Sequence, residues 1–223
     1  MSIHTSEYRE AVDHLPLGAM LVFQQVGWED YEQLLKDLAD RPGVRVSYDD
    51  GRLEIMSPLP EHEEYKDSLY CLVRLFSEVN SIELETRGSA TWKRSSIRKG
   101  SEPDTCFYVA NASRIIGKRD IDLESGDPPP DVVVEIDTTN ESLSKFRIYS
   151  ALAVPEIWRY DGKRTYMYRL ATGSYIEVSE SSSFPGLSTQ AVTEFLDLAK
   201  RQGQTKALKA FRSRLRARKS RRH

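Results

Sequence analysis

The sequence predicts an α/β (α+β) fold in which a mixed β-sheet is flanked by helices. Three observations lead to this prediction. Helical and strand periodicities follow one another along the chain, the segment Asp131–Asp137 (DVVVEID) is strongly β-like, and two predicted helices close the chain. The 223 residues, of which 39% are hydrophobic, suffice for one good-sized core and are too few for two comfortable domains.

The first half of the chain predicts a helix, a hairpin and a long second helix. Apolar residues at i, i+3, i+4 and i+7 over 31–38 indicate an amphipathic helix that Pro42-Gly43 ends. Apolar and polar residues alternate on both sides of Asp50-Gly51, which is the strongest short-range hairpin signal. The prolines of segment 57–60 stop the second strand, and we expect a helix from about His62 to Asn80.

The second half predicts a series of short strands. They are expected over 82–87, 90–93, 104–109, 131–137, 156–160, 165–170 and 175–178. Segment 110–130 is polar and ends in three prolines, so it is expected to be a loop with a short helical turn. Helices are expected over 141–152 and, at the end of the chain, over about 189–201 and 205–219.

The composition excludes several classes of protein. No stretch approaches eighteen consecutive apolar residues, so no membrane span is predicted. Segment Met1–Glu10 is polar and lacks the apolar region of a secretory signal. The two cysteines, Cys71 and Cys106, belong to no CxxC or Cys/His cluster, which argues against a zinc site and a disulfide framework. A cytoplasmic location is expected.

Charge is distributed unevenly along the chain. Segment Lys200–His223 contains eleven Lys/Arg and no Asp/Glu, so the preceding 199 residues have a formal charge of −13 although the whole chain is at −2. A basic tail on an acidic body can contact a polyanion, the protein's own body or solvent. We expect a basic helical tail over 200–223, an N-terminal extension over 1–27 and one domain over 28–199.

Acidic residues occupy two of the predicted strands. In Asp131–Asp137, Glu135 and Asp137 share a face because side chains alternate along a strand, and Glu102 and Asp104 share a face in the same way. Acids at the end of so apolar a strand are costly to bury unless they are paired or bind a metal. Four carboxylates on neighbouring strands can form an oxygen site for Mg²⁺ or Mn²⁺. The alternative is that they cap strand ends in solvent.

Phosphodiester hydrolysis would explain why carboxylates are grouped in this way. A metal ion neutralises a phosphate oxygen and lowers the pKa of its bound water. A nearby lysine can orient that water or stabilise the developing negative charge. Lys145, ten residues after Glu135 in the next predicted helix, is the candidate, and its alternative is an exposed helix position.

Several segments together resemble the Uma2 family, a group of restriction-endonuclease-like proteins. The resemblance covers roughly Trp28 to Val178 and depends on the order and spacing of motifs, none of which is specific alone. The motifs are Asp50-Gly51-Arg52-Leu53-Glu54-Ile55-Met56-Ser57-Pro58 with His62, Glu102-Pro103-Asp104, Pro130-Asp131-Val132-Val133-Val134-Glu135, Lys145 with Tyr149, and Val154-Pro155-Glu156-Ile157-Trp158.

The resemblance implies the PD-(D/E)xK nuclease fold, a mixed sheet flanked by helices, here with an added N-terminal helix and hairpin and with C-terminal helices. It implies that Asp104 is the "PD" acid, Glu135 the "(D/E)" acid and Lys145 the lysine. It also implies a Mg²⁺- or Mn²⁺-dependent endonuclease that acts on DNA.

One position departs from the motif. Asp137 stands two residues after Glu135, where the signature has lysine. Three outcomes are compatible with the sequence. Lys145 reaches the site from the following helix, or Asp137 becomes a further metal ligand with altered catalysis, or activity is lost.

Other residues have weaker assignments. The resemblance implies that His62 contacts phosphate or metal-bound water, and the alternative is an exposed first-turn histidine. Glu63 and Glu64 are reserve site candidates and otherwise favourable first-turn acids. Glu54 is expected to face solvent. Trp92, Trp158 and Tyr149 are expected in the core.

Three functions follow from these observations. The first is a Mg²⁺-dependent DNA endonuclease, and the second is a nuclease-fold protein that binds nucleic acid without turnover. The third is a metal-dependent enzyme with another substrate, because a fold does not determine a function. No GxSxG, Walker A, GxGxxG or HExxH motif competes with these readings. A homodimer is compatible with cleavage of both strands.

Overall fold

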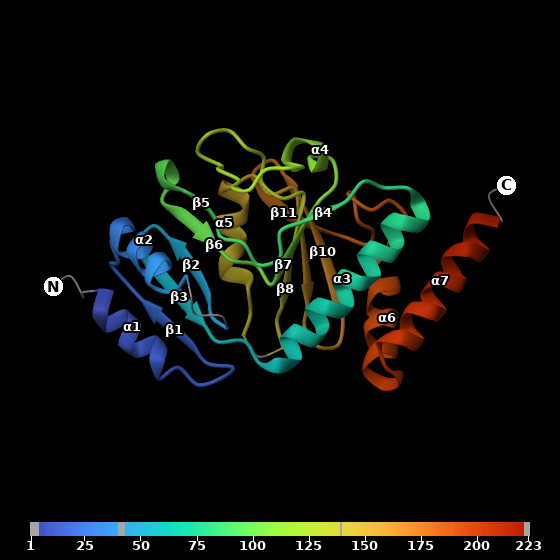
Figure 1. The fold of residues 1–223 in the computed structure, drawn as a ribbon, viewed down its shortest axis with the longest axis horizontal. Helices are drawn as coiled ribbons and strands as arrows, with labels where there is room; N and C mark the ends of the chain where they lie inside the picture. Colours follow the sequence, from blue (N-terminus) through green and yellow to red (C-terminus); the bar gives the residue numbers. More distant parts are fainter. Residues whose placement is uncertain (1–4, 40–42, 139, 221–223) are drawn as a thin grey trace.

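The computed structural model describes residues 5–39, 43–138 and 140–220, and within them the chain forms two β-sheets with helices around them (Figure 1). The first, which we name the hairpin sheet, is antiparallel and has the strand order β1-β3-β2-β6-β5. Its strands are β1 (Met20–Phe23), β2 (Arg45–Asp49), β3 (Arg52–Met56), β5 (Trp92–Arg94) and β6 (Lys99–Ser101).

The second sheet, which we name the mixed sheet, has the order β11-β10-β9-β8-β7-β4. Its strands are β4 (Glu85–Thr86), β7 (Thr105–Tyr108), β8 (Val132–Ile136), β9 (Glu156–Tyr160), β10 (Thr165–Ala171) and β11 (Ser174–Val178). The central pair β8 and β9 is parallel, and the other pairs are antiparallel. The predicted fold class, a mixed sheet flanked by helices, is therefore confirmed.

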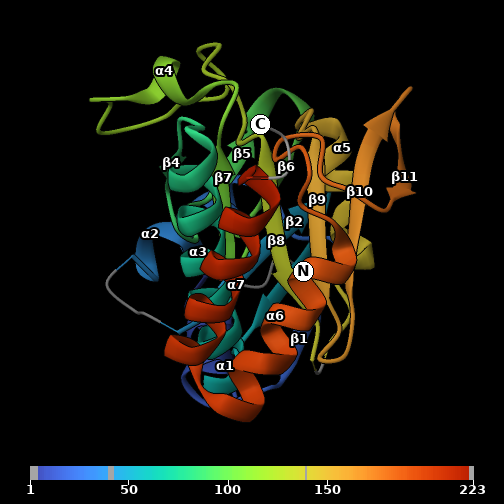
Figure 2. The ribbon, with the colours of Figure 1, turned by 90° about the vertical axis from the view of Figure 1, so that its right-hand side faces the viewer.

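Helices cover both faces of the mixed sheet. Helices α3 (Pro60–Asn80), α6 (Thr189–Gln202) and α7 (Gln204–Ser220) lie side by side on one face (Figure 2). The 3₁₀ turn η2 (Leu143–Lys145) and helix α5 (Phe146–Ala151) lie between β8 and β9 in sequence, as the parallel pairing of these strands requires. The other helical segments are α1 (Thr5–Asp13), α2 (Trp28–Asp37), η1 (Ser95–Ile97) and α4 (Ala112–Ile115).

Strand β8 is central because its side chains are apolar on both faces. Val132, Val134 and Ile136 pack in the core under α3, α6 and α7. Val133 packs on the opposite face, in a core that includes Ile148 of α5. Because side chains alternate along the strand, Glu135 shares the α5 face with Val133. The alternation predicted for this strand is confirmed.

The hairpin sheet has its own core, on which α1 and α2 pack. The β2–β3 hairpin is confirmed, and Asp50 and Gly51 both adopt positive φ, 43° and 98°, as a type I′ turn requires. Helix α1 and strands β1 and β6 were not predicted. Strand β1 pairs with β3, so segment 1–27 contributes an edge strand to this sheet.

Differences from prediction occur mainly at element ends. The predicted strand 82–87 shortens to Glu85–Thr86, and the predicted helix 141–152 begins with the 3₁₀ turn η2. The loop 110–130 contains the expected short turn, α4. The predicted helix stop Pro42 lies outside the described residues.

The chain crosses from one sheet to the other at Pro103. The Glu102 amide donates to the Val46 carbonyl in the hairpin sheet (3.1 Å), whereas the Asp104 amide donates to the Val134 carbonyl in the mixed sheet (3.1 Å). Proline has no N–H with which to continue either ladder. The prediction that Glu102 and Asp104 lie on one strand is therefore wrong, and the site forms where the two sheets meet.

No helix among the described residues is long and apolar enough to cross a membrane. Cys71 is half-buried and Cys106 is buried, and both are free thiols.

Candidate active site at the junction of the two sheets

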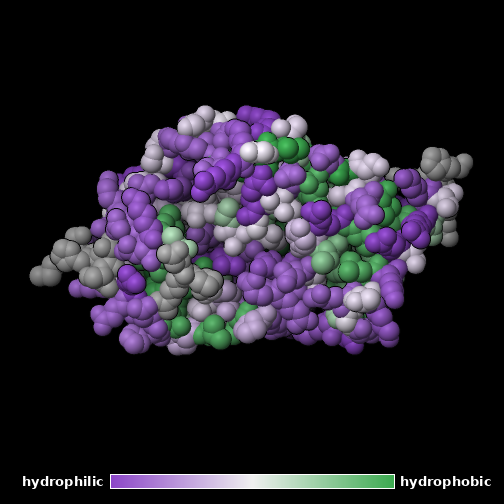
Figure 3. Space-filling view, in the orientation of Figure 1, coloured by the Kyte–Doolittle hydropathy of each residue, from purple (hydrophilic) through white to green (hydrophobic). Residues whose placement is uncertain are grey.

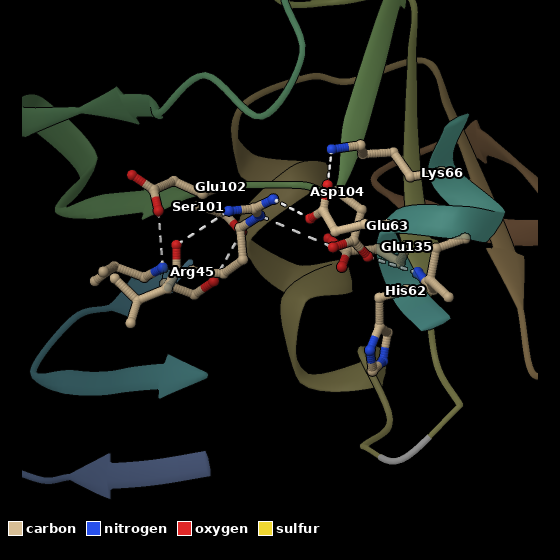
Figure 4. A network of polar contacts seen from close by, with 12 residues as sticks. Arg45, His62, Glu63, Lys66, Ser101, Glu102, Asp104 and Glu135 are labelled. Atoms are coloured by element: carbon tan, nitrogen blue, oxygen red, sulfur yellow. Dashed lines mark hydrogen bonds and ion pairs between the residues drawn. The ribbon is translucent and has the colours of Figure 1, made fainter. Parts of the chain in front are cut away.

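Asp104 and Glu135 lie side by side on the α5 face of the mixed sheet. Strands β7 and β8 pair Thr105 with Val134, so antiparallel register places Asp104 opposite Glu135. Both acids are buried, with exposed fractions of 2% and 1%. The Ile136 amide donates to Asp104 Oδ2 (2.7 Å), which holds the Asp104 carboxylate against the next strand (Figure 4).

Lys145 reaches this pair from η2. Its Nζ donates to Glu135 Oε2 at 2.7 Å, and the lysine is 8% exposed. The structure therefore brings Lys145 to Glu135, which was one of the three outcomes open from the sequence. The exposed-helix alternative for Lys145 is wrong.

A second donor to Glu135 comes from one helical turn further along. The Tyr149 hydroxyl donates to Glu135 Oε1, Ser101 Oγ donates to Tyr149 (3.1 Å), and Ser47 Oγ donates to Ser101 (2.9 Å). Tyr149 is buried as predicted, but its polar role was missed. The spacing contained a signal, because Lys145 and Tyr149 are four residues apart and therefore lie on one face of a helix.

Burial and neighbouring charges shift the pKa values of the groups at the site. Burial raises the pKa of Glu135 to about 7, although Lys145 opposes this shift, and burial also raises the pKa of Asp104. Burial alone would lower the pKa of Lys145, but the charges of Glu135 and Asp104 outweigh it and raise that pKa. Two buried acids thus lie beside two largely buried cations, the Lys145 ammonium group at Glu135 and the Arg45 guanidinium at Asp104.

Arg45 approaches from the hairpin sheet and was not predicted from the sequence. Its Nη2 donates to Glu63 Oε1 (3.1 Å), and its Nε lies 3.9 Å from Asp104 Oδ1. Nε is buried and makes no hydrogen bond within the described residues. Lys66 pairs with Glu63 on α3. An unsatisfied guanidinium N–H beside the acid pair is a donor available to an anion.

Asp137 and Glu102 have other partners. Asp137 pairs with the Arg159 guanidinium and accepts from the Ser142 amide (3.0 Å). Glu102 accepts from the Val46 amide (2.9 Å) and Thr91 Oγ1 (2.5 Å). In the part of the chain that the structure describes, no three His, Cys, Asp or Glu side chains form a group that could hold a metal. The predicted set of four carboxylates is therefore not assembled.

His62 lies in the first turn of α3 and is buried. The Leu59 amide donates to Nδ1 (2.8 Å), so the ring proton is on Nε2, which lies 3.0 Å from Thr138 Oγ1. The exposed alternative is wrong. His62 ties the start of α3 to the loop after Glu135, whereas its predicted contact with phosphate or water stays a prediction.

Glu54 also differs from prediction, because it is buried and pairs with Arg52. It borders a pocket that reaches Glu135 and Lys145. Residues of β1, β2, β3 and the 136–142 segment complete the lining, namely Met20, Arg45, Ser47, Met56, Ile136, Asp137, Asn140, Glu141 and Ser142.

Trp92 and Trp158 are buried as predicted. They therefore offer no exposed ring on which a base could stack.

Comparison with known proteins gives one family match. Residues 28–199 match the Uma2 family, described as "Putative restriction endonuclease". No curated protein matches the chain. A crystal structure of a "putative nuclease belonging to DUF820" from Anabaena variabilis is similar over 67% of this chain and 89% of that one, with 16% identity and a TM-score of 0.45. Because the family match covers most of the chain, this protein belongs to the Uma2 family.

Proposed function

We propose that this protein is a metal-dependent endonuclease that hydrolyses DNA phosphodiester bonds. Membership in a restriction-endonuclease-like family supports a nuclease. The observation that carries the proposal is the buried pair Asp104 and Glu135 with the Lys145 ammonium 2.7 Å from Glu135. These are the acid, acid and lysine roles that the resemblance implies, although the lysine comes from η2 rather than from β8.

The residues fit a divalent cation. Mg²⁺ keeps several waters and is usually held by one or two carboxylates together with substrate phosphates, so two acids suffice. Asp104 uses Oδ2 for the Ile136 amide and turns Oδ1 toward the Arg45 guanidinium. Each Glu135 oxygen accepts one hydrogen bond and retains a lone pair. Asp104 and Glu135 would hold Mg²⁺ or Mn²⁺, which neutralises phosphate charge and acidifies bound water in such reactions.

The cationic side chains have distinct roles in this proposal. Lys145 favours the ionised form of Glu135 and places a positive charge where negative charge develops during hydrolysis. Arg45 offers its Nε–H to a phosphate oxygen beside Asp104. Because both side chains are largely buried, their charges are less screened than surface charges.

Two further groups position these residues. Tyr149 holds Glu135 through its hydroxyl, and Ser101 and Ser47 continue this support into the hairpin sheet. His62 holds the loop that follows Glu135 through Thr138. We propose His62 and Tyr149 as positioning residues.

The test is a cleavage assay on purified full-length protein with supercoiled DNA, linear duplex DNA and RNA, each with Mg²⁺, Mn²⁺ or EDTA. We expect DNA cleavage that requires metal and is lost in Asp104→Asn and Glu135→Gln. Glu177→Gln is the matched control, because the Glu177 side chain is 51% exposed on the edge strand β11, away from the site, and it should cleave as the wild type does.

Two results would contradict the proposal. Folded wild-type protein that cleaves none of these substrates excludes the nuclease in this form, and retention of DNA by that inactive protein favours the binding function. Cleavage that survives both acid substitutions places the chemistry elsewhere.

A further inference from the structure

Helix α7 carries a basic stripe that the candidate site does not use. The helix contains no acidic residue and lies after the segment that matches the family, 28–199. Lys206, Lys209, Arg212 and Arg216 are exposed, and their spacing of three, three and four places them on one helical face. We name these four residues the basic stripe.

The opposite face fixes the orientation of the helix. Ala207, Phe211 and Leu215 are buried in the core shared with α3 and α6, and the Phe211 ring contacts Phe195 of α6 edge-on with centroids 5.7 Å apart. Figure 3 shows hydrophobic residues where α6 and α7 meet, with hydrophilic residues at the outer edge. The basic stripe is therefore held toward solvent by packing behind it.

Other cations of α7 bind the protein itself. Arg214 pairs with Glu194 (2.5 Å), Arg218 donates to the Gly186 carbonyl (2.6 Å) and Lys219 donates to the Val79 carbonyl (3.2 Å). Within the described residues, none of the four charged side chains of the basic stripe makes a hydrogen bond or an ion pair, so their charges are available to a partner.

The basic stripe begins near the end of α3 that carries His62. At the end of α6, Lys200 lies 3.4 Å from Glu61 in the first turn of α3, and α7 starts four residues later. Helix α7 then runs along α3 as far as Val79 (Figure 2). The ten helical steps from Lys206 to Arg216 span about 15 Å, which corresponds to roughly four phosphates of one DNA strand.

We propose that the basic stripe binds the phosphodiester backbone of nucleic acid, outside the candidate active site. That the polymer is a nucleic acid rests on the proposed function. That the basic stripe is a binding site rests on the exposure and the charge of its four side chains. An anionic membrane fits less well, because the exposed face lacks the large apolar side chains that enter a bilayer and the apolar face is packed on α3 and α6.

A second copy of this chain is the other candidate partner, since its first 199 residues are acidic. Four evenly spaced, uncompensated cations match the regular charge of a nucleic-acid backbone more directly. The test below includes both competing partners.

The test measures binding of full-length protein to 30-base-pair DNA and RNA duplexes in EDTA, by fluorescence anisotropy over a range of salt concentrations. The basic-stripe variant is Lys206→Gln/Lys209→Gln/Arg212→Gln/Arg216→Gln. The control, Lys36→Gln/Arg119→Gln/Lys163→Gln/Arg169→Gln, removes the same charge from exposed positions elsewhere.

We expect the basic-stripe variant to bind at least tenfold more weakly than the wild type at low salt. Each lost phosphate contact reduces the slope of log K against log salt by about 0.9, so the slope falls by up to about 3.6. The control should bind like the wild type. Equal effects on DNA and RNA support backbone contact in general, and a larger effect on DNA identifies DNA as the partner.

Several outcomes would overturn the inference. Three concern the duplexes: unchanged binding in the basic-stripe variant, equal weakening in the control, or no duplex binding by the wild type. The fourth is binding only to anionic vesicles, seen by flotation, or only to a second copy of the chain, seen by sedimentation. If the quadruple variant fails to fold, Arg212→Gln alone keeps the test open, with an expected slope change of about 0.9. Because EDTA prevents metal-dependent cleavage, this binding assay tests the basic stripe alone. The cleavage assay tests the nuclease proposal, so either one can fail without the other.

Discussion

Lys145 Nζ lies 2.7 Å from Glu135 Oε2, although ten residues and the loop after β8 separate them in sequence. The position two residues after Glu135, where the motif has lysine, holds Asp137, which pairs with Arg159 instead. The positive charge beside the acid pair is therefore supplied from η2 rather than from the strand. Substitutions at Lys145 and at Asp137 should therefore have different effects on DNA cleavage.

Lys145→Gln should reduce the rate of DNA cleavage by roughly 10²- to 10³-fold, which is the usual loss when one charge-stabilising donor is removed. Single-turnover cleavage with saturating Mg²⁺ measures this effect. Lys145→Arg keeps the charge and should recover part of the rate. Equal rates for Lys145→Gln and the wild type would show that the ammonium has no part in the reaction.

Asp137→Lys, which restores the motif lysine, should not improve the enzyme. It places a second cation beside Arg159 and removes the acceptor for the Ser142 amide, so it should destabilise the fold by about 3–5 kcal/mol. Urea unfolding measures this loss, and Asp137→Asn should lose less stability because it adds no charge. Faster cleavage by a stable Asp137→Lys variant would contradict the assignment of the lysine role to Lys145.

Tyr149→Phe should lower the free energy of unfolding by about 1–3 kcal/mol, because it leaves Glu135 Oε1 without its donor and the Ser101 hydroxyl without its acceptor. Denaturant unfolding of the variant provides the measurement. Tyr70→Phe is the matched control, since the Tyr70 hydroxyl meets Arg74 at the surface, and should change stability by less than about 0.5 kcal/mol. A loss no greater than that of the control would argue against the Tyr149 hydrogen bonds.

Cys106 should resist alkylation in the folded protein. Burial raises the pKa of its thiol to about 12, so at pH 8 almost no thiolate is present, and the side chain is inaccessible. In Cys71→Ser, iodoacetamide should label Cys106 only after urea is added, which mass spectrometry can follow. Rapid labelling of the native variant would contradict the packing of β7.

Strand β8 and the residues around it were predictable because local pattern determines them. The alternation in Asp131–Asp137 correctly assigned Val132, Val134 and Ile136 to one face and Glu135 to the other. The hairpin was predictable from Asp50-Gly51 for the same reason. Lys145 required the resemblance, since a lysine in a predicted helix is by itself an ordinary surface residue.

Other parts of the site depend on contacts between the two sheets. Arg45 meets Asp104 only because the chain changes sheets at Pro103, and no periodicity in the sequence reports that crossing. Glu54 lies where the Ser144 hydroxyl, from the segment after β8, donates to Glu54 Oε2 (3.3 Å), and the alternation along β3 does not report this contact either. The separation of Glu102 from Asp104 follows from one missing N–H, at Pro103, within a segment that otherwise alternates like a strand.

The most direct test of the proposed metal site is a titration of full-length protein with Mn²⁺. Calorimetry measures the binding, and electron paramagnetic resonance measures the free Mn²⁺. We predict that the wild type and Asp137→Asn bind Mn²⁺ with the same affinity, because Asp137 is engaged by Arg159. Asp104→Asn and Glu135→Gln should each weaken binding at least tenfold while remaining folded. Wild-type affinity in both acid variants, or loss of binding in Asp137→Asn alone, would contradict a site built on Asp104 and Glu135.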